Sequence, residues 1–214
     1  MDRTLTVLLP VENAQATLAR DVRRLLEILP ELTDSFEVLI IDDGSTDATI
    51  EVADDLSSRF PQIRVMRNST PRGRTRAIQH GIRKSHGEFL LLIDEDSNLP
   101  IDEVGRIWAA AEEHDIVLGR LPSTAAYNAS RLRRLDGPIH GGYQMLRRRT
   151  VGTIWDSLGH QLTLRAELAR TGGKWFEIEI GVVHAGACYR GPSPAGRPNR
   201  PNYLQAIRDF ALGE

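Results

Sequence analysis

Along the first 120 residues, hydrophobic positions follow two alternating patterns. Short apolar runs alternate with longer stretches in which apolar residues return every three or four positions. The first pattern is typical of buried strands and the second of amphipathic helices. The predicted strands are residues 4–9, 37–41, 63–66, 88–93 and 115–118, and the predicted helices are residues 14–29, 46–59, 72–85 and 101–113. Pro10 is expected to end the first strand, Asn13 to cap the first helix, and Ser45 or Thr46 to cap the second.

This order of elements predicts an α/β fold, with a mostly parallel sheet and helices on both of its faces. Ligands of open α/β sheets bind beyond the carboxyl ends of the strands. We therefore expect the functional groups in the segments that follow the strands. These segments are residues 10–13, 42–45, 94–98 and 119–120.

The regular alternation ends at Arg120. Residues 121–138 have no clean period and are expected to form a loop or a lid. Beyond them we predict strands at residues 142–146 and 175–183, a helix at 160–171, a proline-rich segment at 191–201 and a short helix at 203–212. The length of 214 residues fits a single domain, made of a regular part (1–120), a less regular part (121–190) and a tail (191–214).

Composition restricts the class of protein. Hydrophobic residues make up 41% and charged residues 26%, and the net charge of −2 gives no indication of a nucleic-acid partner. Cys188 is the only cysteine, so no internal disulfide can form and a cytoplasmic location is expected. Even the longest apolar runs, such as residues 89–93, are too short to span a membrane, so any membrane contact is expected to be peripheral.

Arginines gather in one short region of the second half. They are Arg131, Arg133, Arg134, Arg147, Arg148 and Arg149. A guanidinium group suits phosphate because its planar fork donates paired hydrogen bonds. The cluster is therefore either a phosphate-binding or membrane-directed surface or an ordinary solvated face, and the sequence leaves both interpretations open.

Three consecutive acids, Asp94, Glu95 and Asp96, directly follow the predicted strand at residues 88–93. Carboxylates at positions i and i+2 can converge on a hard cation such as Mg²⁺ or Mn²⁺. Acid pairs with this spacing are common by chance in an acid-rich chain. The position at an expected binding edge is what favours a metal site over a solvated acidic surface.

A second acidic pair, Asp42 and Asp43, follows the second predicted strand. A turn and the start of a helix account for Ser45 and Asp47, because hydroxyl and carboxylate groups favour that position. They do not require two adjacent acids after an apolar strand. A carboxylate here can accept a hydrogen bond from a nucleobase N–H.

Together these segments resemble the motifs of family 2 glycosyltransferases with the GT-A fold, and within them the dolichyl-phosphate mannose synthase-like branch. The matching segments, in family order, are residues 7–13, 41–47, 72–73 and 93–100. The resemblance covers about residues 4–184. It implies a GT-A-like α/β fold and a metal-dependent, inverting transfer of sugar from a nucleotide-sugar donor. Residues 1–120 would bind the donor, and residues 121–190 the acceptor.

The same resemblance assigns roles to single residues. Asp94 and Asp96 would hold Mg²⁺ or Mn²⁺, with Asn98 and His184 as further ligands, and Asp96 and Arg120 are the expected catalytic residues. Asp43 would pair with the base, and glycines would let backbone approach the sugar, because glycine lacks a Cβ. The expected donor-binding residues are Pro10, Val11, Glu12, Asp42, Asp43, Arg72, Asp94, Glu95, Arg120, Gly141 and Gly142.

The chain departs from the family pattern where the acceptor would be activated. Gln161 and Thr163 align where the family carries an acidic base, and Glu167 lies further along the same predicted helix. Near the amino end, Glu12 replaces the usual aromatic residue, and Ala14 stands where an acid is common. The missing base favours an acceptor that is already an anion, such as a polyprenyl phosphate.

Two other classes remain open. Without a base, the chain is also compatible with a nucleotide-sugar-binding homologue that has weak or no activity. A nucleotidyltransferase would also place paired acids on an α/β sheet. Such enzymes carry a glycine- and basic-rich loop after the first strand, whereas residues 10–15 contain neither residue type, which argues against this class.

Overall fold

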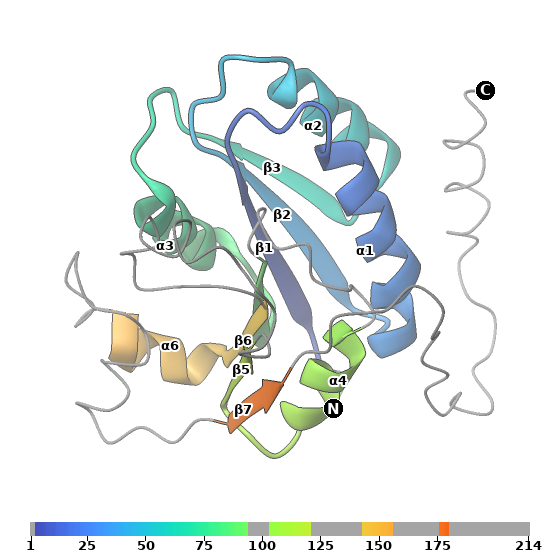
Figure 1. The fold of residues 1–214 in the computed structure, drawn as a ribbon, viewed down its shortest axis with the longest axis vertical. Coiled ribbons are helices and arrows are strands. Elements are labelled where there is room, and N and C mark those ends of the chain that lie inside the picture. Colours follow the sequence, from blue (N-terminus) through green and yellow to red (C-terminus); the bar gives the residue numbers. More distant parts are fainter. Residues whose placement is uncertain (1–2, 94–102, 121–142, 156–175, 180–214) are drawn as a thin grey trace.

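The computed structural model describes residues 3–93, 103–120, 143–155 and 176–179 (Figure 1). Its strands are β1 (Leu5–Val11), β2 (Phe36–Asp42), β3 (Ile63–Arg67), β4 (Phe89–Ile93), β5 (Ile116–Arg120), β6 (Tyr143–Arg147) and β7 (Phe176–Glu179). Its helices are α1 (Leu18–Leu32), α2 (Thr49–Arg59), α3 (Arg74–Lys84), α4 (Glu103–Ala110) and α6 (Arg148–Trp155). Every strand and helix predicted within the described residues is present.

The described strands form one sheet in the order β3-β2-β1-β4-β6-β5-β7. Strands β1 to β4 pair with one another in parallel, whereas β6 runs antiparallel to both β4 and β5. Because β6 is antiparallel to both of these strands, β4 and β5 run in the same direction. The mostly parallel α/β sheet is confirmed, but the insertion of β6 between β4 and β5 is not visible in the order of elements.

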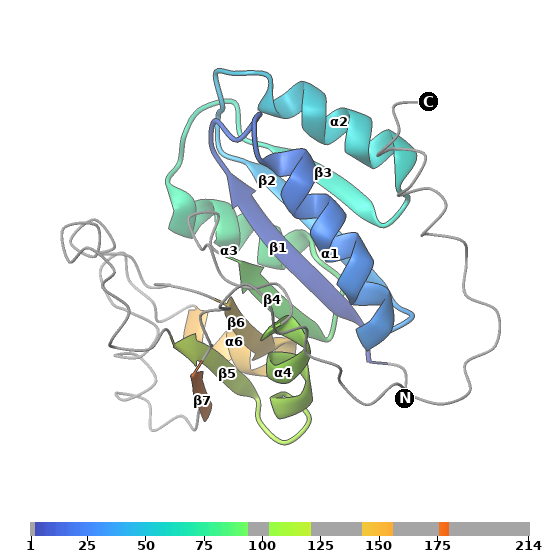
Figure 2. The same ribbon diagram turned by 45° about the vertical axis from the view of Figure 1, so that its right-hand side comes forward.

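Helices cover both faces of the sheet, as the alternation predicts (Figures 1 and 2). Apolar residues of α1, α2 and α4 share one core with alternate residues of β1, including Leu5, Val7 and Leu9. The second core joins α3 and the start of α6 to the other face, where Leu8 points. Successive strand side chains point to opposite faces, so a strand buried on both sides is apolar throughout.

Three expected element ends are wrong. Pro10 lies inside β1 instead of ending it, in a part of β1 that pairs with β2 but extends past the register with β4. Asn13 does not cap α1, which begins five residues later with Thr17 at the N-cap position. Neither Ser45 nor Thr46 caps α2, whose N-cap position is Ala48. The polar side chains at these positions bind other loops, as described below.

Helix α6 was not predicted, because the arginines that begin it read as a surface cluster and only a short apolar pattern follows them. The strands expected at residues 142–146 and 175–183 correspond to β6 and β7. The expected loop at 121–138, the helix at 160–171 and the tail at 191–214 lie outside the described residues. None of the described helices combines the length and the apolar character that a membrane crossing requires.

Candidate functional site

The strand register brings several chain exits to one edge of the sheet. Leu92 of β4 and Leu118 of β5 both pair with Gln144 of β6, so these two parallel strands are level with each other. Ile93 then ends β4, immediately before the acidic segment, and Arg120 ends β5 at the same edge. Because β6 lies between β4 and β5, the ends of these two strands are about 10 Å apart. This carboxyl edge is where the sequence predicts the site.

Further segments reach the same edge. Tyr143, which follows the two glycines, pairs with Ile93 at the end of β4. Glu179 of β7 pairs with Arg120, so the chain toward His184 also leaves the sheet here. The predicted residues Asp94, Glu95, Asp96, Asn98, Gly141, Gly142 and His184, and the base positions Gln161, Thr163 and Glu167, lie outside the described residues. Arg120 is described through its backbone alone.

Asp43 is the candidate residue of this edge with the most contacts that the structure describes. Its Oδ1 accepts hydrogen bonds from Asn68 Nδ2 at 2.8 Å and from the backbone N–H of Arg72 at 3.0 Å. Its Oδ2 accepts one from the backbone N–H of Gly73 at 2.8 Å. The backbone N–H of Asp43 donates to the carbonyl of Val11 at 3.0 Å. With a side chain that is 5% exposed, Asp43 thus fastens the β3–α3 loop (residues 68–73) to the ends of β1 and β2.

These contacts bear on the expected role of Asp43 as the reader of the base. An ionised carboxylate offers about four acceptor sites. Three N–H donors from the protein occupy Asp43, and the remaining acceptor direction belongs to Oδ2. A contact with a base would therefore be made by a carboxylate that the loop already holds in place. The pairing itself stays a prediction.

Two glycines allow the loops of this edge to interlock. Gly44 and Gly73 both adopt positive φ, at 82° and 84°, a region that side chains other than glycine rarely enter. Gly44 also packs against Pro71, and a Cβ at position 44 would lie 2.7 Å from Pro71 Cδ. A side chain at Gly44 would therefore push the β3–α3 loop away from the turn after β2.

Asn13 connects the exit of β1 to the turn after β2. Its backbone N–H donates to Ser45 Oγ at 2.9 Å, and its Oδ1 accepts from the backbone N–H of Thr46 at 2.9 Å. Asn13 itself adopts a positive φ of 54°, which asparagine tolerates better than most residues. Nearby, hydrogen bonds from Thr49 hold the pKa of the Asp47 carboxyl below its ordinary value. The polar residues expected as helix caps thus join loops distant in sequence.

The other residues expected to bind the donor at the ends of β1 and β2 mostly make contacts within the protein. The Val11 side chain lies in the core, so a donor could meet only its backbone. Asp42 is buried, and its Oδ1 accepts the backbone N–H of Ser45 at 3.3 Å within the turn. Glu12 and the Arg72 side chain are exposed at the same edge.

Sequence reasoning missed Arg74. This first residue of α3 extends across the edge, and its guanidinium donates to the carbonyl of Ile93 at 3.2 Å. Ile93 is the last residue of β4, directly before Asp94. A half-buried positive charge is thereby held where the acidic segment begins. The available signal was the run of basic residues around the 72–73 motif.

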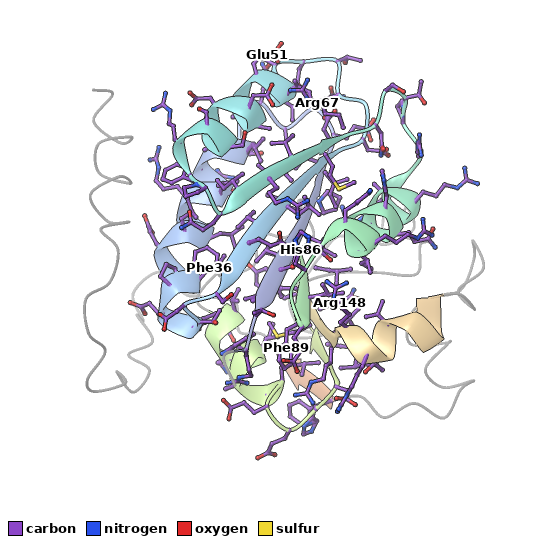
Figure 3. The ribbon with its side chains drawn as sticks, turned by 180° about the vertical axis from the view of Figure 1, so that it is seen from behind. Phe36, Glu51, Arg67, His86, Phe89 and Arg148 are labelled. Carbon is purple, nitrogen blue, oxygen red and sulfur yellow. The ribbon has the colours of Figure 1, made fainter. Side chains whose placement is uncertain are left out.

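The arginines at 147–149, part of the cluster predicted to be either a phosphate-binding or membrane-directed surface or a solvated face, lie at the amino edge of the sheet, away from the predicted site. Arg147 pairs with Phe89 at the amino end of β4, four residues and about 13 Å from Ile93. Arg148 lies near Phe89, whereas Arg67 marks the opposite, carboxyl end of the neighbouring strands (Figure 3). Arg131, Arg133 and Arg134 lie outside the described residues. Residues 147–149 are therefore not at the carboxyl edge, where the site is predicted.

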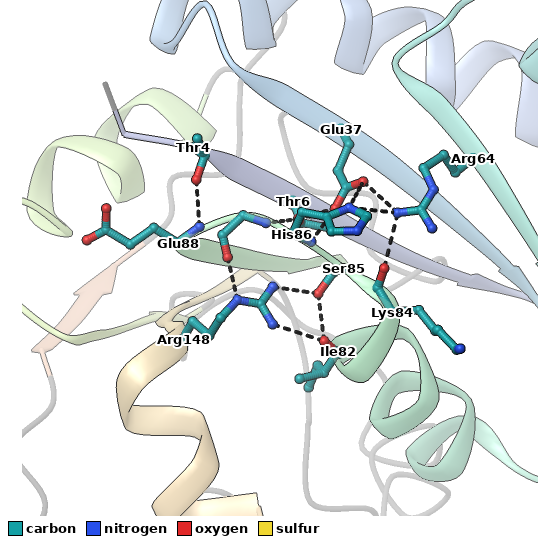
Figure 4. A network of polar contacts seen from close by, with 11 residues as sticks. Thr4, Thr6, Glu37, Arg64, Ile82, Lys84, Ser85, His86, Glu88 and Arg148 are labelled. Atoms are coloured by element: carbon teal, nitrogen blue, oxygen red, sulfur yellow. Dashed lines mark hydrogen bonds and ion pairs between the residues drawn. The ribbon is translucent and has the colours of Figure 1, made fainter. Parts of the chain in front are cut away.

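These three arginines instead tie the elements of the amino edge together. Arg147 and Arg149 both bind Asp115 before β5. The Arg148 guanidinium donates to the carbonyls of Gly87 at 2.7 Å and Ile82 at 3.1 Å, and to Ser85 Oγ at 2.7 Å (Figure 4). In this way α6 is joined to the carboxyl end of α3 and to the entry of β4.

Glu37 organises the same edge from β2. It accepts hydrogen bonds from Thr6 Oγ1 at 2.7 Å, Arg64 Nη1 at 2.9 Å and the backbone N–H of His86 at 2.7 Å (Figure 4). Partial burial alone would raise the pKa of Glu37, but these hydrogen bonds outweigh it and lower the pKa to about 2. The polar network of the amino edge is thus a structural fastening.

The relatives of the chain are transferases. A chain that is 28% identical over 170 residues is the undecaprenyl-phosphate 4-deoxy-4-formamido-L-arabinose transferase of Salmonella choleraesuis (strain SC-B67). The match covers 73% of this chain and 51% of that relative, so the chain spans about half the length of the curated relatives it matches.

Solved structures share the fold. A mannosyltransferase from Pyrobaculum calidifontis, in complex with GDP-Man and Mn²⁺, superposes with a TM-score of 0.61 at 20% identity, covering 84% of this chain and 55% of that one. Glucosyl-3-phosphoglycerate synthase from Mycobacterium tuberculosis, in complex with Mg²⁺ and UDP, gives a TM-score of 0.60 at 19% identity, covering 98% and 77%. These likenesses confirm the expected GT-A-like fold. The model of the family described as "Glycosyl transferase family 2" matches residues 6–172, and the chain therefore belongs to that family.

Proposed function

We propose that this chain is a metal-dependent glycosyltransferase, which moves a sugar from a nucleotide-sugar donor bound at the carboxyl edge to an acceptor. The observation that carries the proposal is the convergence of three features on one edge: the fastened carboxylate of Asp43, the guanidinium of Arg74 and the entry to Asp94. In this proposal residues 1–120 bind the donor, residues 121–190 bind the acceptor, and residues 191–214 form a tail.

The metal would be held by Asp94 and Asp96, with Asn98 and His184 as further ligands. Carboxylate and amide oxygens are the donors that Mg²⁺ and Mn²⁺ prefer, so the residue types fit the ion. Arg74 supports this placement, because its guanidinium donates to the carbonyl of Ile93, the residue directly before Asp94, and so adds positive charge where the acidic segment begins. When bound, the ion would neutralise charge on the departing nucleoside diphosphate.

The residues of the chain would bind and orient the donor. Asp43 keeps the β3–α3 loop closed against the nucleoside side and offers its remaining acceptor direction to a base N–H. Arg74 and Arg120 would add positive charge facing the diphosphate, which stabilises a leaving group that gains negative charge. The acceptor would attack the anomeric carbon from the face opposite the leaving group, with inversion.

The acceptor that we propose is a lipid phosphate of the polyprenyl type. One of the relatives is named as an undecaprenyl-phosphate sugar transferase. In addition, Gln161 and Thr163 offer no carboxylate to take a proton from a hydroxyl acceptor. General-base assistance is worth roughly 10²–10⁴ in rate, and a phosphate monoester, mostly ionised near neutral pH, has little need of it.

Donor binding is tested by calorimetry with UDP- and GDP-sugars, with and without Mn²⁺, on the full chain and on Asp96→Asn. We expect tight binding only with metal, and a large loss in the variant, because a diphosphate would otherwise face uncompensated carboxylates. Asp34→Asn, an exposed acid outside the site, is the matched control. Unchanged affinity in Asp96→Asn, or in wild type with EDTA, contradicts the metal assignment.

Transfer is tested by supplying radiolabelled donors with polyprenyl phosphate or with free sugars as acceptors. We expect transfer to the lipid phosphate. Efficient transfer to a hydroxyl acceptor alone would contradict the acceptor proposal and direct the search for a base to Glu167. Metal-dependent donor binding without transfer to either acceptor would instead support a binding homologue without activity.

A further inference from the structure

Basic residues accumulate in one segment of an otherwise slightly acidic protein. Residues 56–87 contain no Asp or Glu but eight Arg or Lys residues, in a chain whose net charge is −2. The segment runs from the end of α2 through β3 and α3 to the entry of β4. Such a one-sided distribution is unusual for a solvated surface, on which acids and bases normally alternate.

Half of these cations are committed to contacts inside the protein. Arg59 pairs with Asp55, Arg64 with Glu37, Arg67 with Asp54, and Arg74 donates to the carbonyl of Ile93. The other four are Arg72, Arg76, Arg83 and Lys84, all of them exposed. Within the part of the chain that the structure describes, none of these four has an ion pair. We call these four residues the basic stripe.

The stripe follows the outer face of α3. Arg76 and Arg83 are seven residues apart, which is close to two helical turns, so they lie on the same side of the helix. The opposite side of α3 packs into the core through Ala77, Ile78 and Ile82. Lys84 ends the helix, so Arg76 to Lys84 covers about 12 Å along its axis, and Arg72 lies two residues before the first residue of the helix. Figure 2 shows α3 on the outside of the sheet, away from α1 and α2.

The residue types of the basic stripe favour a ligand that carries phosphate groups but no nucleobases. Single-stranded nucleic acid is normally bound by cations together with exposed aromatic rings on which bases stack. The only Phe, Tyr or Trp residue in residues 56–87 is Phe60, which is buried at 4% exposure. A group of cations without an exposed Phe, Tyr or Trp matches instead an array of anionic headgroups, to which Lys and Arg are attracted at close range.

We propose that the basic stripe of α3 docks this protein on an anionic phospholipid surface. The inference extends the proposed function, because a polyprenyl phosphate acceptor is anchored in a bilayer. The amino end of α3 adjoins Gly73, which Asp43 holds at the carboxyl edge. Docking through α3 therefore brings this edge next to the lipid surface, and α3 does not need to cross the membrane.

The test measures flotation of the full chain with phosphatidylglycerol–phosphatidylcholine vesicles and with pure phosphatidylcholine vesicles. Each cation near an anionic surface contributes roughly fivefold to partition, so Arg76→Gln/Arg83→Gln should bind the anionic vesicles roughly 25-fold more weakly. The matched control is Arg20→Gln/Arg24→Gln, which removes two exposed cations with helical spacing from α1, on the other face of the sheet. We expect the control to bind as wild type does.

The outcomes separate this inference from the proposed function. Absence of wild-type binding to anionic vesicles at low salt, or equal losses in both double variants, overturns the docking surface. Tighter binding to a single-stranded RNA than to the vesicles overturns the choice of partner. Donor affinity, measured by calorimetry without vesicles, should be the same in Arg76→Gln/Arg83→Gln as in wild type. A wild type that floats but binds no nucleotide sugar contradicts the proposed function and leaves the docking surface standing.

Discussion

Replacing Asp43 by Asn tests whether its carboxylate holds the β3–α3 loop. Asn keeps the size and one acceptor oxygen. If its NH₂ group takes the place of Oδ2, it faces the backbone N–H of Gly73, and two donors then point at each other. The substitution also weakens the bonds from Asn68 and Arg72, because hydrogen bonds to a charged acceptor are about twice as strong as neutral ones. One orphaned buried donor costs about 1–3 kcal/mol, so we expect a total loss of about 2–4 kcal/mol.

Urea and thermal denaturation measure this loss. In a domain of this size it corresponds to roughly 4–16 °C in Tm. Asp54→Asn is the control, because Asp54 is an exposed carboxylate paired with Arg67 and should cost less than about 1 kcal/mol. Asn68→Ala removes one of the three donors to Asp43 and should weaken nucleotide binding less than Asp43→Asn does. If Asp43→Asn abolishes nucleotide binding with no loss of stability, the carboxylate serves the ligand alone and our reasoning fails.

Three further changes address the two edges of the sheet. Glu37→Gln should lower the free energy of unfolding by about 2 kcal/mol at neutral pH. Because the pKa of Glu37 is lowered in the folded protein, this stabilisation is lost on protonation, and the difference from wild type should shrink as the pH falls from 4.5 toward 2. Urea titrations across this pH range test the prediction. Arg148→Met should cost about 2–3 kcal/mol and Arg149→Met less than about 1 kcal/mol, and equal losses would contradict the buried role of the first guanidinium. Gly44→Ala should cost about 1–3 kcal/mol through its positive φ and its clash with Pro71, and a wild-type Tm would refute it.

The strands were predictable because their physical cause is local. Residues 89–93 form an uninterrupted apolar run, and the structure places β4 at Phe89–Ile93, buried on both faces. The helix starts were less predictable because their determinants are distant in sequence. Asn13 is a residue type that often caps helices, yet its side chain accepts a hydrogen bond from Thr46, which is 33 residues away. No local pattern distinguishes a side chain that caps its own helix from one that fastens another loop.

The arginine cluster shows a second limit of sequence reasoning. Residues 147–149 are close in sequence to Arg131, Arg133 and Arg134, and the sequence treats them as one cluster, either a phosphate-binding or membrane-directed surface or a solvated face. Strand β6 carries residues 147–149 away from the carboxyl edge, because it crosses the sheet and ends beside Phe89 at the amino edge. The direction of a strand depends on its partners, and a single short strand can pair either way. The common edge of the candidate residues after β1 and β2 was predictable because parallel strands bring their exits to one edge.

The proposed donor site and the basic stripe share one segment, and this predicts that they are coupled. Asp43 binds the backbone of Arg72 and Gly73, which lead directly into α3. If docking of α3 steadies this loop, lipid binding and donor binding must strengthen each other by the same factor, since linkage is reciprocal. We expect calorimetric affinity for a nucleotide sugar to rise several-fold on anionic vesicles and to stay constant on phosphatidylcholine vesicles. The vesicle affinity of Asp43→Asn should then no longer respond to the donor. Equal donor affinity on both vesicle types would show that the stripe is a passive anchor, energetically separate from the site.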